Sequence, residues 1–448
     1  MDLIIENDVY IKNLQKIAND ILLLAIKKGA SQASVSINSG IGMELSVRMQ
    51  KIETIQYQKD QILVLTVYFG KKKGSISITD ININSLKKAL YIACKIAKFT
   101  EKDNFCGLPK SNELAKIWPN LDIFYPWNLS VKKGIKILMD CEKIAIDKNR
   151  KICNSNGAIL NTYNNISILA NTYGFNHAFT SSLYSISLGL IAEENNIIEQ
   201  DYEYTTARSH LDLWPIEKIA NFAVKKTIAK LNAKSVGTKK VPIIFSAFTA
   251  ISLIDHFIKA ISGENLYQKI SFLKDAINTM IFPEWFEIIE DPFIPKGIGT
   301  TPYDMEGVKL KQRKIVENGF LKEFILDTYS ARKLGLQTTG NSGGIHNLII
   351  KYNHTGGISS LIKDIDYGLI ITELMGSGAN ILNGDYSRGA KGFWIKNGEI
   401  LHAVNEVTIA GKLQNIFKNI QYISNDIEMR SSIRTGSIMI KEMTISSS

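Results

Sequence analysis

A glycine-rich stretch near the C-terminus, Thr372–Gly411, constrains the fold of this 448-residue chain more than any other part. It contains two Asn-Gly pairs, Asn383-Gly384 and Asn397-Gly398, and a third pair, Asn318-Gly319, lies upstream. Both central residues of a type I′ turn need a positive φ, which Asn and Gly tolerate, so each pair predicts a β-hairpin. The stretch therefore predicts the sheet of a β-rich domain, with glycine where another backbone comes close. The strands expected beside these turns are Gly392–Lys396, Glu399–Val404, Val308–Glu317 and Phe320–Leu326.

The first half of the chain combines amphipathic helices with alternating strands. Apolar residues at helical spacing predict a helix over Val9–Lys28, which Gly29 ends. Asn84 is the predicted N-cap of a second helix, Ser85–Phe99. The order helix, strands, helix makes this an α+β protein. The strands expected between the helices are Ala33–Ile37, Met43–Arg48, Lys51–Gln58 and Ile62–Phe69.

A polar segment, Asn232–Lys240, marks the predicted domain boundary. It contains Gly237, it follows a helix that opens after Pro215, and the apolar strand Val241–Phe245 comes next. We therefore expect two domains, an N-terminal α+β domain over residues 1–235 and a C-terminal β-rich domain over residues 236–448.

Composition bears on the compartment and on partners. The chain has no apolar run of about 18 residues, which excludes a transmembrane helix. Residues 1–8 carry three acidic side chains and no basic one, unlike a signal peptide, so we expect a cytoplasmic protein. The net charge is +10, but the lysines are scattered, which argues against nucleic acid as a partner. Four cysteines at long spacings are expected to be free thiols: Cys94, Cys106, Cys141 and Cys153.

Few residues outside the helix described next suggest chemistry. Asp304 and Glu306 share one face of an extended segment, where they either act as an acid–base pair or hold a turn beside Gly307. His346 and His354 are close enough in sequence to meet across a hairpin and line a pocket. Ser387 has no Gly-x-Ser-x-Gly context, and no glycine cluster leads into a Gly-Lys-Ser/Thr phosphate loop.

The helix Ala247–Ile261, capped by Ser246, carries the mechanistic question. Its apolar stripe at helical spacing includes Ile254 and Ile258, and His256 lies roughly opposite that stripe. We therefore expect His256 to be either a surface residue or one with satisfied hydrogen bonds, with contact to a metal from a partner chain as the open alternative. No residue three or four positions away from His256 is a useful zinc ligand.

Several segments together resemble the PmbA/TldE family, and the resemblance covers most of the chain. They are ISGENLYQKISFL (residues 261–273), YDMEGV (303–308), TTGNSGG (338–344), GDYSRGAKGFWIKNGEI (384–400), VTIAG (407–411) and ISNDIE (423–428). The resemblance implies a cytoplasmic subunit that joins a TldD-like partner in a heteromeric zinc peptidase. It implies leader peptides and unfolded antitoxins as substrates.

In that family the TldD partner is expected to carry His-Glu-x-x-x-His on this helix. At the matching positions this chain has Ile254, Asp255 and Lys259, and no cysteine follows Cys153 to supply the further ligand that the resemblance implies. We therefore expect no metal and no catalytic residue in this chain, with zinc in the partner subunit.

A substrate groove is predicted in the C-terminal domain, between the 338–344 loop and the 373–388 strands. Arg388 either reaches a peptide carbonyl or carboxylate, or pairs with an acidic neighbour, Asp385 or Glu373. Two alternatives remain open, a peptide-binding scaffold without a catalytic role and a metal-independent hydrolase. The groove candidates are Glu373, Asp385, Arg388, Asn341 and His346.

Overall fold

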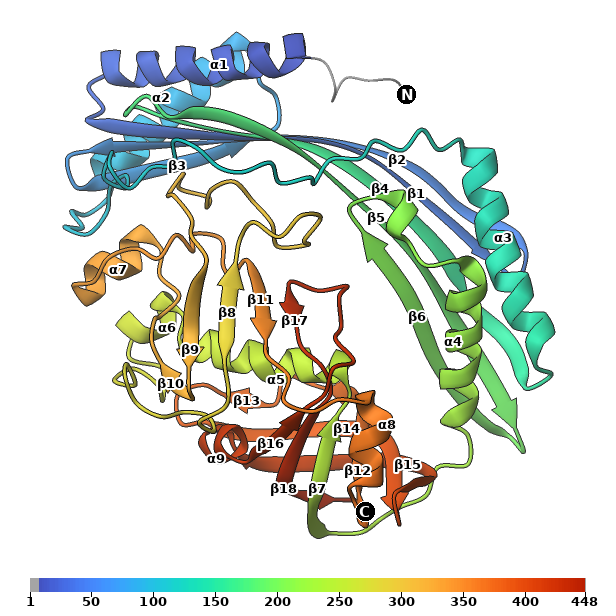
Figure 1. The fold of residues 1–448 in the computed structure, drawn as a ribbon. Coiled ribbons are helices and arrows are strands. Elements are labelled where there is room, and N and C mark those ends of the chain that lie inside the picture. The colour runs from blue at the N-terminus through green and yellow to red at the C-terminus, as the bar shows by residue number, and fades with distance from the viewer. Residues whose placement is uncertain (1–7, 448) are drawn as a thin grey trace.

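The computed structural model describes residues 8–447. A long antiparallel sheet forms the N-terminal half and arches over the C-terminal half, which lies on its concave side (Figure 1). Its strand order is β3-β2-β1-β4-β5-β6. The strands are β1 (Gln32–Arg48), β2 (Lys51–Phe69), β3 (Lys72–Ile78), β4 (Ile152–Asn171), β5 (Asn176–Glu194) and β6 (Ile197–Ala207).

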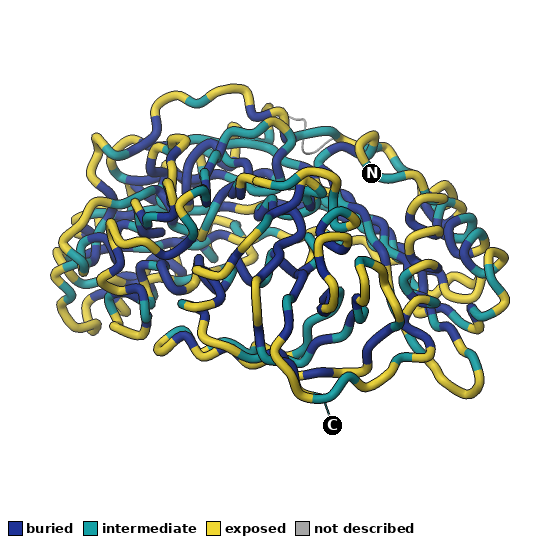
Figure 2. The backbone as a smooth tube through the Cα atoms, turned by 60° about the horizontal axis from the view of Figure 1, so that its bottom comes forward, coloured by how far each residue is buried: buried dark blue, intermediate teal, exposed yellow. Residues whose placement is uncertain are grey.

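Four helices cover the convex face of this sheet in two pairs (Figure 1). The first pair, α1 (Asp8–Lys27) and α2 (Ile83–Phe99), packs on β1, β2 and β4. The second pair, α3 (Val131–Lys148) and α4 (Ile216–Ala229), packs on β1, β4 and β5 near the other end. Figure 2 shows the buried residues concentrated along the strands and on the inner sides of these helices. The N-terminal half thus has two separate apolar clusters on one sheet.

The C-terminal half contains two further sheets. One has the order β10-β9-β8-β11-β17. In the other, the pairings β12–β7, β7–β18, β18–β15, β15–β14 and β14–β12 close on themselves, so five of its strands form a small barrel. The strands are β7 (Lys239–Phe245), β8 (Ile288–Asp291), β9 (Arg313–Glu317), β10 (Phe320–Leu321), β11 (Asn347–Ile350), β12 (Tyr367–Met375), β13 (Ala379–Asn380), β14 (Asp385–Lys396), β15 (Glu399–Lys412), β16 (Ile420–Ile423), β17 (Ile433–Arg434) and β18 (Ile438–Ser446).

A single helix, α5 (Ala247–Ala260), lies between these two C-terminal sheets and joins them in one apolar cluster (Figure 1). The remaining helices are short: η1 (His210–Asp212), α6 (Gly263–Tyr267), α7 (Thr328–Leu334), α8 (Gly357–Lys363) and α9 (Leu413–Lys418). The α+β class and the β-rich C-terminal half are confirmed. Within residues 8–447, no helix combines the length and the apolarity needed to cross a membrane.

Two predicted boundaries change in the structure. The first sheet strand is continuous over Gln32–Arg48 rather than broken in two, because Gly40 and Gly42 remain paired with both neighbouring strands. The second helix begins two residues earlier, since the side chain of Asn82, not Asn84, accepts the N–H groups of its first turn. These differences shift boundaries without altering the class of fold.

All three Asn-Gly pairs lie in hairpins, and two of them have the predicted turn geometry. Asn318-Gly319 and Asn397-Gly398 both have positive φ at each residue and join paired strands. Asn383-Gly384 also lies in a hairpin, in the loop over residues 381–384 that joins β13 to β14, but it is not a type I′ turn, because only Gly384 has a positive φ. The Asn383 side chain instead accepts the Asp385 N–H at 2.9 Å, which forms a different turn.

The outer edge of β6 faces the junction of the two halves and is capped by cations. Lys226, Lys230 and Arg430 donate to the carbonyls of Tyr202, Gln200 and Tyr204 at 3.0, 3.3 and 2.6 Å. Arg430 also binds a carboxylate of β6 across the junction. These donors occupy the carbonyls at which another strand would add, so this edge is closed to strand addition.

Candidate functional site

The packing of α5 decides what the helix can do chemically. Ser246 caps it by accepting the Thr249 N–H, as the sequence predicts. Ile254 is fully buried, and the apolar cluster around α5 includes residues of both C-terminal sheets. The helix is therefore buried over most of its circumference, not along one stripe.

The three positions that match the zinc motif do not converge. Ile254 belongs to the core, whereas Asp255 and Lys259 form an ion pair at 2.7 Å on the outer side of the helix. Residues five apart on a regular α-helix point about 140° away from each other. Ile254 and Lys259 therefore face different surroundings. The carboxylate of Asp255, which lies between them in sequence, is already paired with the Lys259 ammonium group.

His256 is not on the surface, and its hydrogen bonds are not all satisfied within residues 8–447, so both parts of that prediction are wrong. Its side chain is buried, and its ring packs edge-on against Tyr386 with the ring centres 5.8 Å apart. Burial lowers the pKa of His256 to about 4, and the positive charge of Arg388 acts in the same direction. The imidazole is therefore neutral at physiological pH, and its Nε2 has no hydrogen-bond partner in the described part of the chain.

Arg388 connects β14 to α5. Its Nη1 donates to the Ser252 hydroxyl at 2.6 Å, and its Nε donates to the Met375 carbonyl at 3.5 Å. Burial raises the pKa of Tyr386 to about 12 even though Arg388 opposes that shift. We refer to Ser252, His256, Tyr386 and Arg388 as the Arg388 cluster. It places a fixed cation beside a neutral imidazole.

Gly378 makes room for this arginine. Its φ is +57°, and a Cβ at that position would lie 1.8 Å from Arg388 Cγ. The glycine-rich stretch thus contributes a real close approach as well as turns.

The acidic neighbours proposed as alternative partners of Arg388 bind other residues. Glu373 forms an ion pair with Lys230 at 2.6 Å, at the junction with the N-terminal half. Asp385 pairs with Lys412, also at 2.6 Å, on the surface of the barrel. Neither of the two expected salt bridges to Arg388 therefore forms.

Asn341 and His346 do not face a groove, because both are buried in a network around an ion pair. Arg313 and Glu290 form that pair at 2.8 Å, and Asn341 bonds to both of them. The His346 N–H donates to Glu290, while the His346 ring contacts the Gly340 carbonyl. The polar groups of Asn341 and His346 are thus used inside the fold.

His346 and His354 do not line a common pocket. The His354 ring contacts the Ser360 hydroxyl, whereas the His346 ring contacts the Gly340 carbonyl. Asp304 holds a turn, since its carboxylate accepts the N–H groups of Glu306, Val308 and Ser342 at 2.8–3.0 Å. The turn-holding role predicted for this acidic pair is confirmed for Asp304.

The glycine-rich strand β14 offers no open backbone to a peptide. It pairs with β15 along one edge and with β12 and β13 along the other. A peptide therefore cannot add to β14 as a further strand, since both edges of this strand are already paired.

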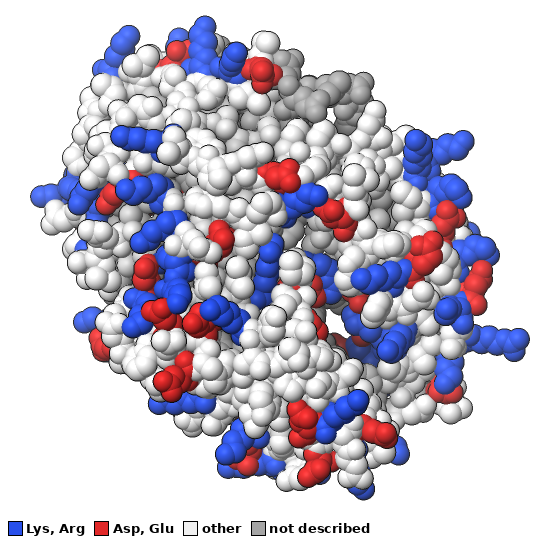
Figure 3. Space-filling model, in the orientation of Figure 1, with Lys and Arg blue, Asp and Glu red and all other residues white. Residues whose placement is uncertain are grey.

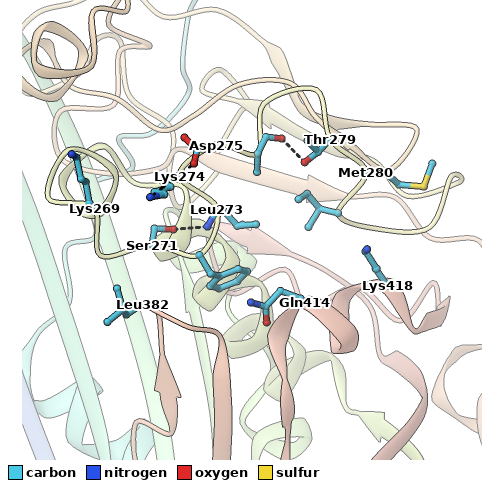
Figure 4. Close-up of a pocket in the computed structure, with 13 residues that line it drawn as sticks. Lys269, Ser271, Leu273, Lys274, Asp275, Thr279, Met280, Leu382, Gln414 and Lys418 are labelled. Atoms are coloured by element: carbon cyan, nitrogen blue, oxygen red, sulfur yellow. Dashed lines mark hydrogen bonds and ion pairs between the residues drawn. The ribbon is translucent and has the colours of Figure 1, made fainter.

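A surface cleft of about 530 Å³ was not predicted from the sequence. It lies between the 269–281 loop and α9, and three lysines, Lys269, Lys274 and Lys418, surround it (Figure 4). Of the predicted groove segment, Leu382 lines this cleft. On the face shown in Figure 3, lysines and arginines are interspersed with acidic side chains rather than gathered in one stripe.

The comparison with known families gives the class of this α+β protein. Three family models of PmbA/TldA metallopeptidase domains match the chain: domain 1 over residues 33–97, the central domain over residues 124–231 and the C-terminal domain over residues 238–447. A Haemophilus influenzae protein named Metalloprotease PmbA homolog is 40% identical over 423 residues, covering 94% of each chain. The chain belongs to the PmbA/TldD family.

Solved structures support the fold. A Bacteroides thetaiotaomicron protein, named for modulation of DNA gyrase, superposes with a TM-score of 0.93 at 24% identity and covers 99% of this chain and all of its own. TldE from Thermococcus kodakarensis superposes with a TM-score of 0.84 at 22% identity, covering 96% of this chain and all of its own. At these identities the likeness concerns the fold alone.

The metal of a metallopeptidase does not fit the residues around α5. Among residues 8–447, no group of three His, Cys, Asp or Glu side chains is placed to hold a metal ion. His256 has a free Nε2, but Asp255 is paired with a lysine and the guanidinium of Arg388 would repel a cation at that nitrogen. We derive no catalytic step through a metal on this chain.

Proposed function

We propose that this chain is the subunit without zinc in a cytoplasmic two-component peptidase. A TldD-like partner carries the metal, and the complex processes or degrades unfolded peptides such as leader peptides and antitoxins. In this proposal the chain shapes the chamber and contributes no catalytic residue.

The observation that carries the proposal is the environment of α5. The matching motif positions hold a core side chain, Ile254, and a surface ion pair, Asp255–Lys259, while a fixed cation, Arg388, lies beside the one imidazole. Zinc needs several neutral or anionic donors that converge on one point. Because this chain lacks such donors, a zinc ion in a peptidase that contains it would be held by another chain.

The sheet edge left open by the structure suits the binding of an extended segment. β3 pairs with β2 only over Leu63–Phe69, so no strand among residues 8–447 pairs with residues 51–62 of β2 on that side. Ile52, Ile55 and Tyr57 are about half exposed there. Extended peptides or partner strands add to such an edge through main-chain hydrogen bonds, with side chains filling alternate positions.

Co-purification tests the proposal. A tagged copy of this chain, co-expressed with a His-Glu-x-x-x-His homologue, is expected to retain that partner, and the complex is expected to contain zinc and cleave an unfolded peptide. The purified chain alone is expected to hold no stoichiometric zinc and to cleave nothing. About one tightly bound zinc per isolated chain would refute the assignment of the metal to the partner.

A peptide-binding scaffold without a catalytic partner is the second candidate. It predicts peptide binding by the isolated chain and no recruitment of a zinc-containing protein. The co-purification experiment separates the two, because only the peptidase subunit gains activity when the homologue is present.

A further inference from the structure

A second pocket lies between the two halves of the chain, away from the Arg388 cluster. It has a volume of about 640 Å³ and is lined by the β2–β3 hairpin, the 100–107 connector, the turn at Glu306 and the start of α7. Tyr329 of α7 binds Asp103 of the connector at 2.7 Å. Arg332 of α7 donates to three connector carbonyls at 2.6–3.1 Å. These bonds fix the two walls relative to each other.

The pocket is rich in carboxylates. Four acidic residues line it against two lysines, Lys71 and Lys73. Lys71 donates to the Cys106 carbonyl, and Lys73 is an exposed residue on β3. Among residues 8–447, none of the four carboxylates forms an ion pair, and the hydrogen bonds that they accept come from amide and hydroxyl groups. The four are Glu101, Asp103, Glu306 and Asp327.

Two polar groups that line the pocket have unused capacity to bind a ligand, the Tyr68 hydroxyl and the partly buried carboxylate of Glu306. Tyr68 is 7% exposed, and no residue in the described part of the chain makes a hydrogen bond to its hydroxyl. Glu306 accepts the Thr328 N–H through Oε2 at 3.0 Å, with no cation paired to it. Burial is the main cause that raises the pKa of Glu306, and Arg332 opposes it only as a minor cause. An almost fully buried phenol without a hydrogen-bond partner, beside a partly buried carboxylate without a cation, indicates a missing ligand.

We propose that this pocket binds a primary ammonium group, carried either by a peptide or by a free polyamine. An ammonium group has three donors and one positive charge, which match Glu306, the Asp327 carboxylate and the Tyr68 hydroxyl oxygen. Asp327 uses Oδ1 to cap α7, which leaves its Oδ2 for a ligand. A metal ion fits less well, because no three metal-ligating side chains converge within residues 8–447.

Calorimetric titration of the purified full chain tests this inference. The probes are a ten-residue lysine-free peptide with a free amino terminus, the same peptide N-acetylated, and spermidine. The free peptide or spermidine is expected to bind, and acetylation is expected to weaken peptide binding at least about tenfold, because it removes the charge and two donors.

Two variants locate the site, and a third is the control. Glu306→Gln is expected to weaken binding at least about tenfold while its amide oxygen still accepts the Thr328 N–H, and Tyr68→Phe is expected to weaken it about three- to tenfold. Glu442→Gln, on the surface of the barrel, is expected to leave affinity unchanged. Circular dichroism verifies that each variant is folded.

The outcomes separate the sources of the ammonium group. Binding of the free peptide, lost on acetylation, assigns the site to a peptide amino terminus, while binding of spermidine alone assigns it to a free polyamine. Equal binding of the acetylated peptide, no binding of any amine at about 1 mM, or unchanged affinity in Glu306→Gln would overturn the proposal. The isolated chain is used throughout, so the result does not depend on whether a zinc-containing partner exists.

Discussion

Replacing Arg313 with methionine is expected to lower the free energy of unfolding of the C-terminal half by about 3–5 kcal/mol, because it leaves a buried carboxylate unpaired. The side chains of Arg313 and Glu290 are 3% and 2% exposed. Nε and Nη2 of the arginine both reach Oε2 of the glutamate at 2.8 Å. In Arg313→Met that oxygen keeps its charge and loses both donors.

The other bonds of Arg313 add less to this cost. Its contact with Glu323, at 2.7 Å, involves a carboxylate that is one-third exposed, so water can replace the guanidinium. The C-terminal domain match spans residues 238–447, and for a unit of that size 1 kcal/mol shifts the melting temperature by about 2–4 °C. The expected decrease in melting temperature is therefore about 6–20 °C.

A second substitution, Glu290→Gln, is expected to change the free energy of unfolding in opposite directions in the unmodified chain and in Arg313→Met. In the unmodified chain, Glu290→Gln is expected to destabilise, because it leaves the guanidinium with only Glu323 as a charged partner. In the Arg313→Met background the same change is expected to stabilise by at least about 1 kcal/mol, because it removes the unpaired charge. The glutamine oxygen can still accept from Asn341 and from the His346 N–H.

Urea unfolding of the four proteins, followed by tryptophan fluorescence and far-ultraviolet circular dichroism, measures these differences. Lys314→Met serves as the control, since its ion pair with Glu317 is exposed and should contribute less than about 0.5 kcal/mol. If Glu290→Gln has the same sign in both backgrounds, or if Arg313→Met costs less than about 1 kcal/mol, the buried pair is not what stabilises this region.

Three further predictions concern the site, the charges and the domain boundary. Arg388→Ala in the reconstituted complex is expected to weaken peptide cleavage while assembly stays intact. If the substitution instead lowers the melting temperature, reduces activity in proportion, and is rescued by Arg388→Lys, the role of Arg388 is to position α5 through Ser252. Burial raises the pKa of Asp304 to about 7. The contribution of Asp304 to the free energy of unfolding is therefore fully present below about pH 4 and is expected to fall as the pH rises to 7. Urea unfolding at several pH values should show a weaker pH dependence for Asp304→Asn. Limited proteolysis is expected to cut first within residues 232–240, and cleavage within α5 instead would count against that boundary.

The elements that the sequence predicts well are those determined by neighbouring residues. The hairpins at Asn318-Gly319 and Asn397-Gly398 depend on two adjacent residues that accept positive φ. The start of α5 depends on a single capping side chain, Ser246. Each of these signals lies within a few positions of the structure that it specifies, so it can be read without tertiary contacts.

The burial of His256 illustrates what the sequence does not reveal. Helical periodicity assumes one buried face and one solvated face, but α5 is enclosed by strands from opposite ends of the C-terminal half, such as β8 and β14. Asn341 and His346 were placed on a groove for a related reason. Their glycine-rich surroundings suggest an exposed loop, whereas the ion pair that buries them comes from β8 and β9.

The geometry of α5 also bears on whether this chain could hold a zinc ion at the motif positions. In the helix observed here, Ile254 and Lys259 point about 140° apart, so histidines at both positions would place one imidazole in the core and the other in solvent. A zinc ion near His256 would further have to overcome the charge of Arg388, which Ser252 and Met375 hold in place. Restoring the motif residues alone would therefore not restore a metal site. The donors fail to converge because of how α5 packs and where Arg388 is held. This packing is the physical reason for testing whether a metal is bound by another chain.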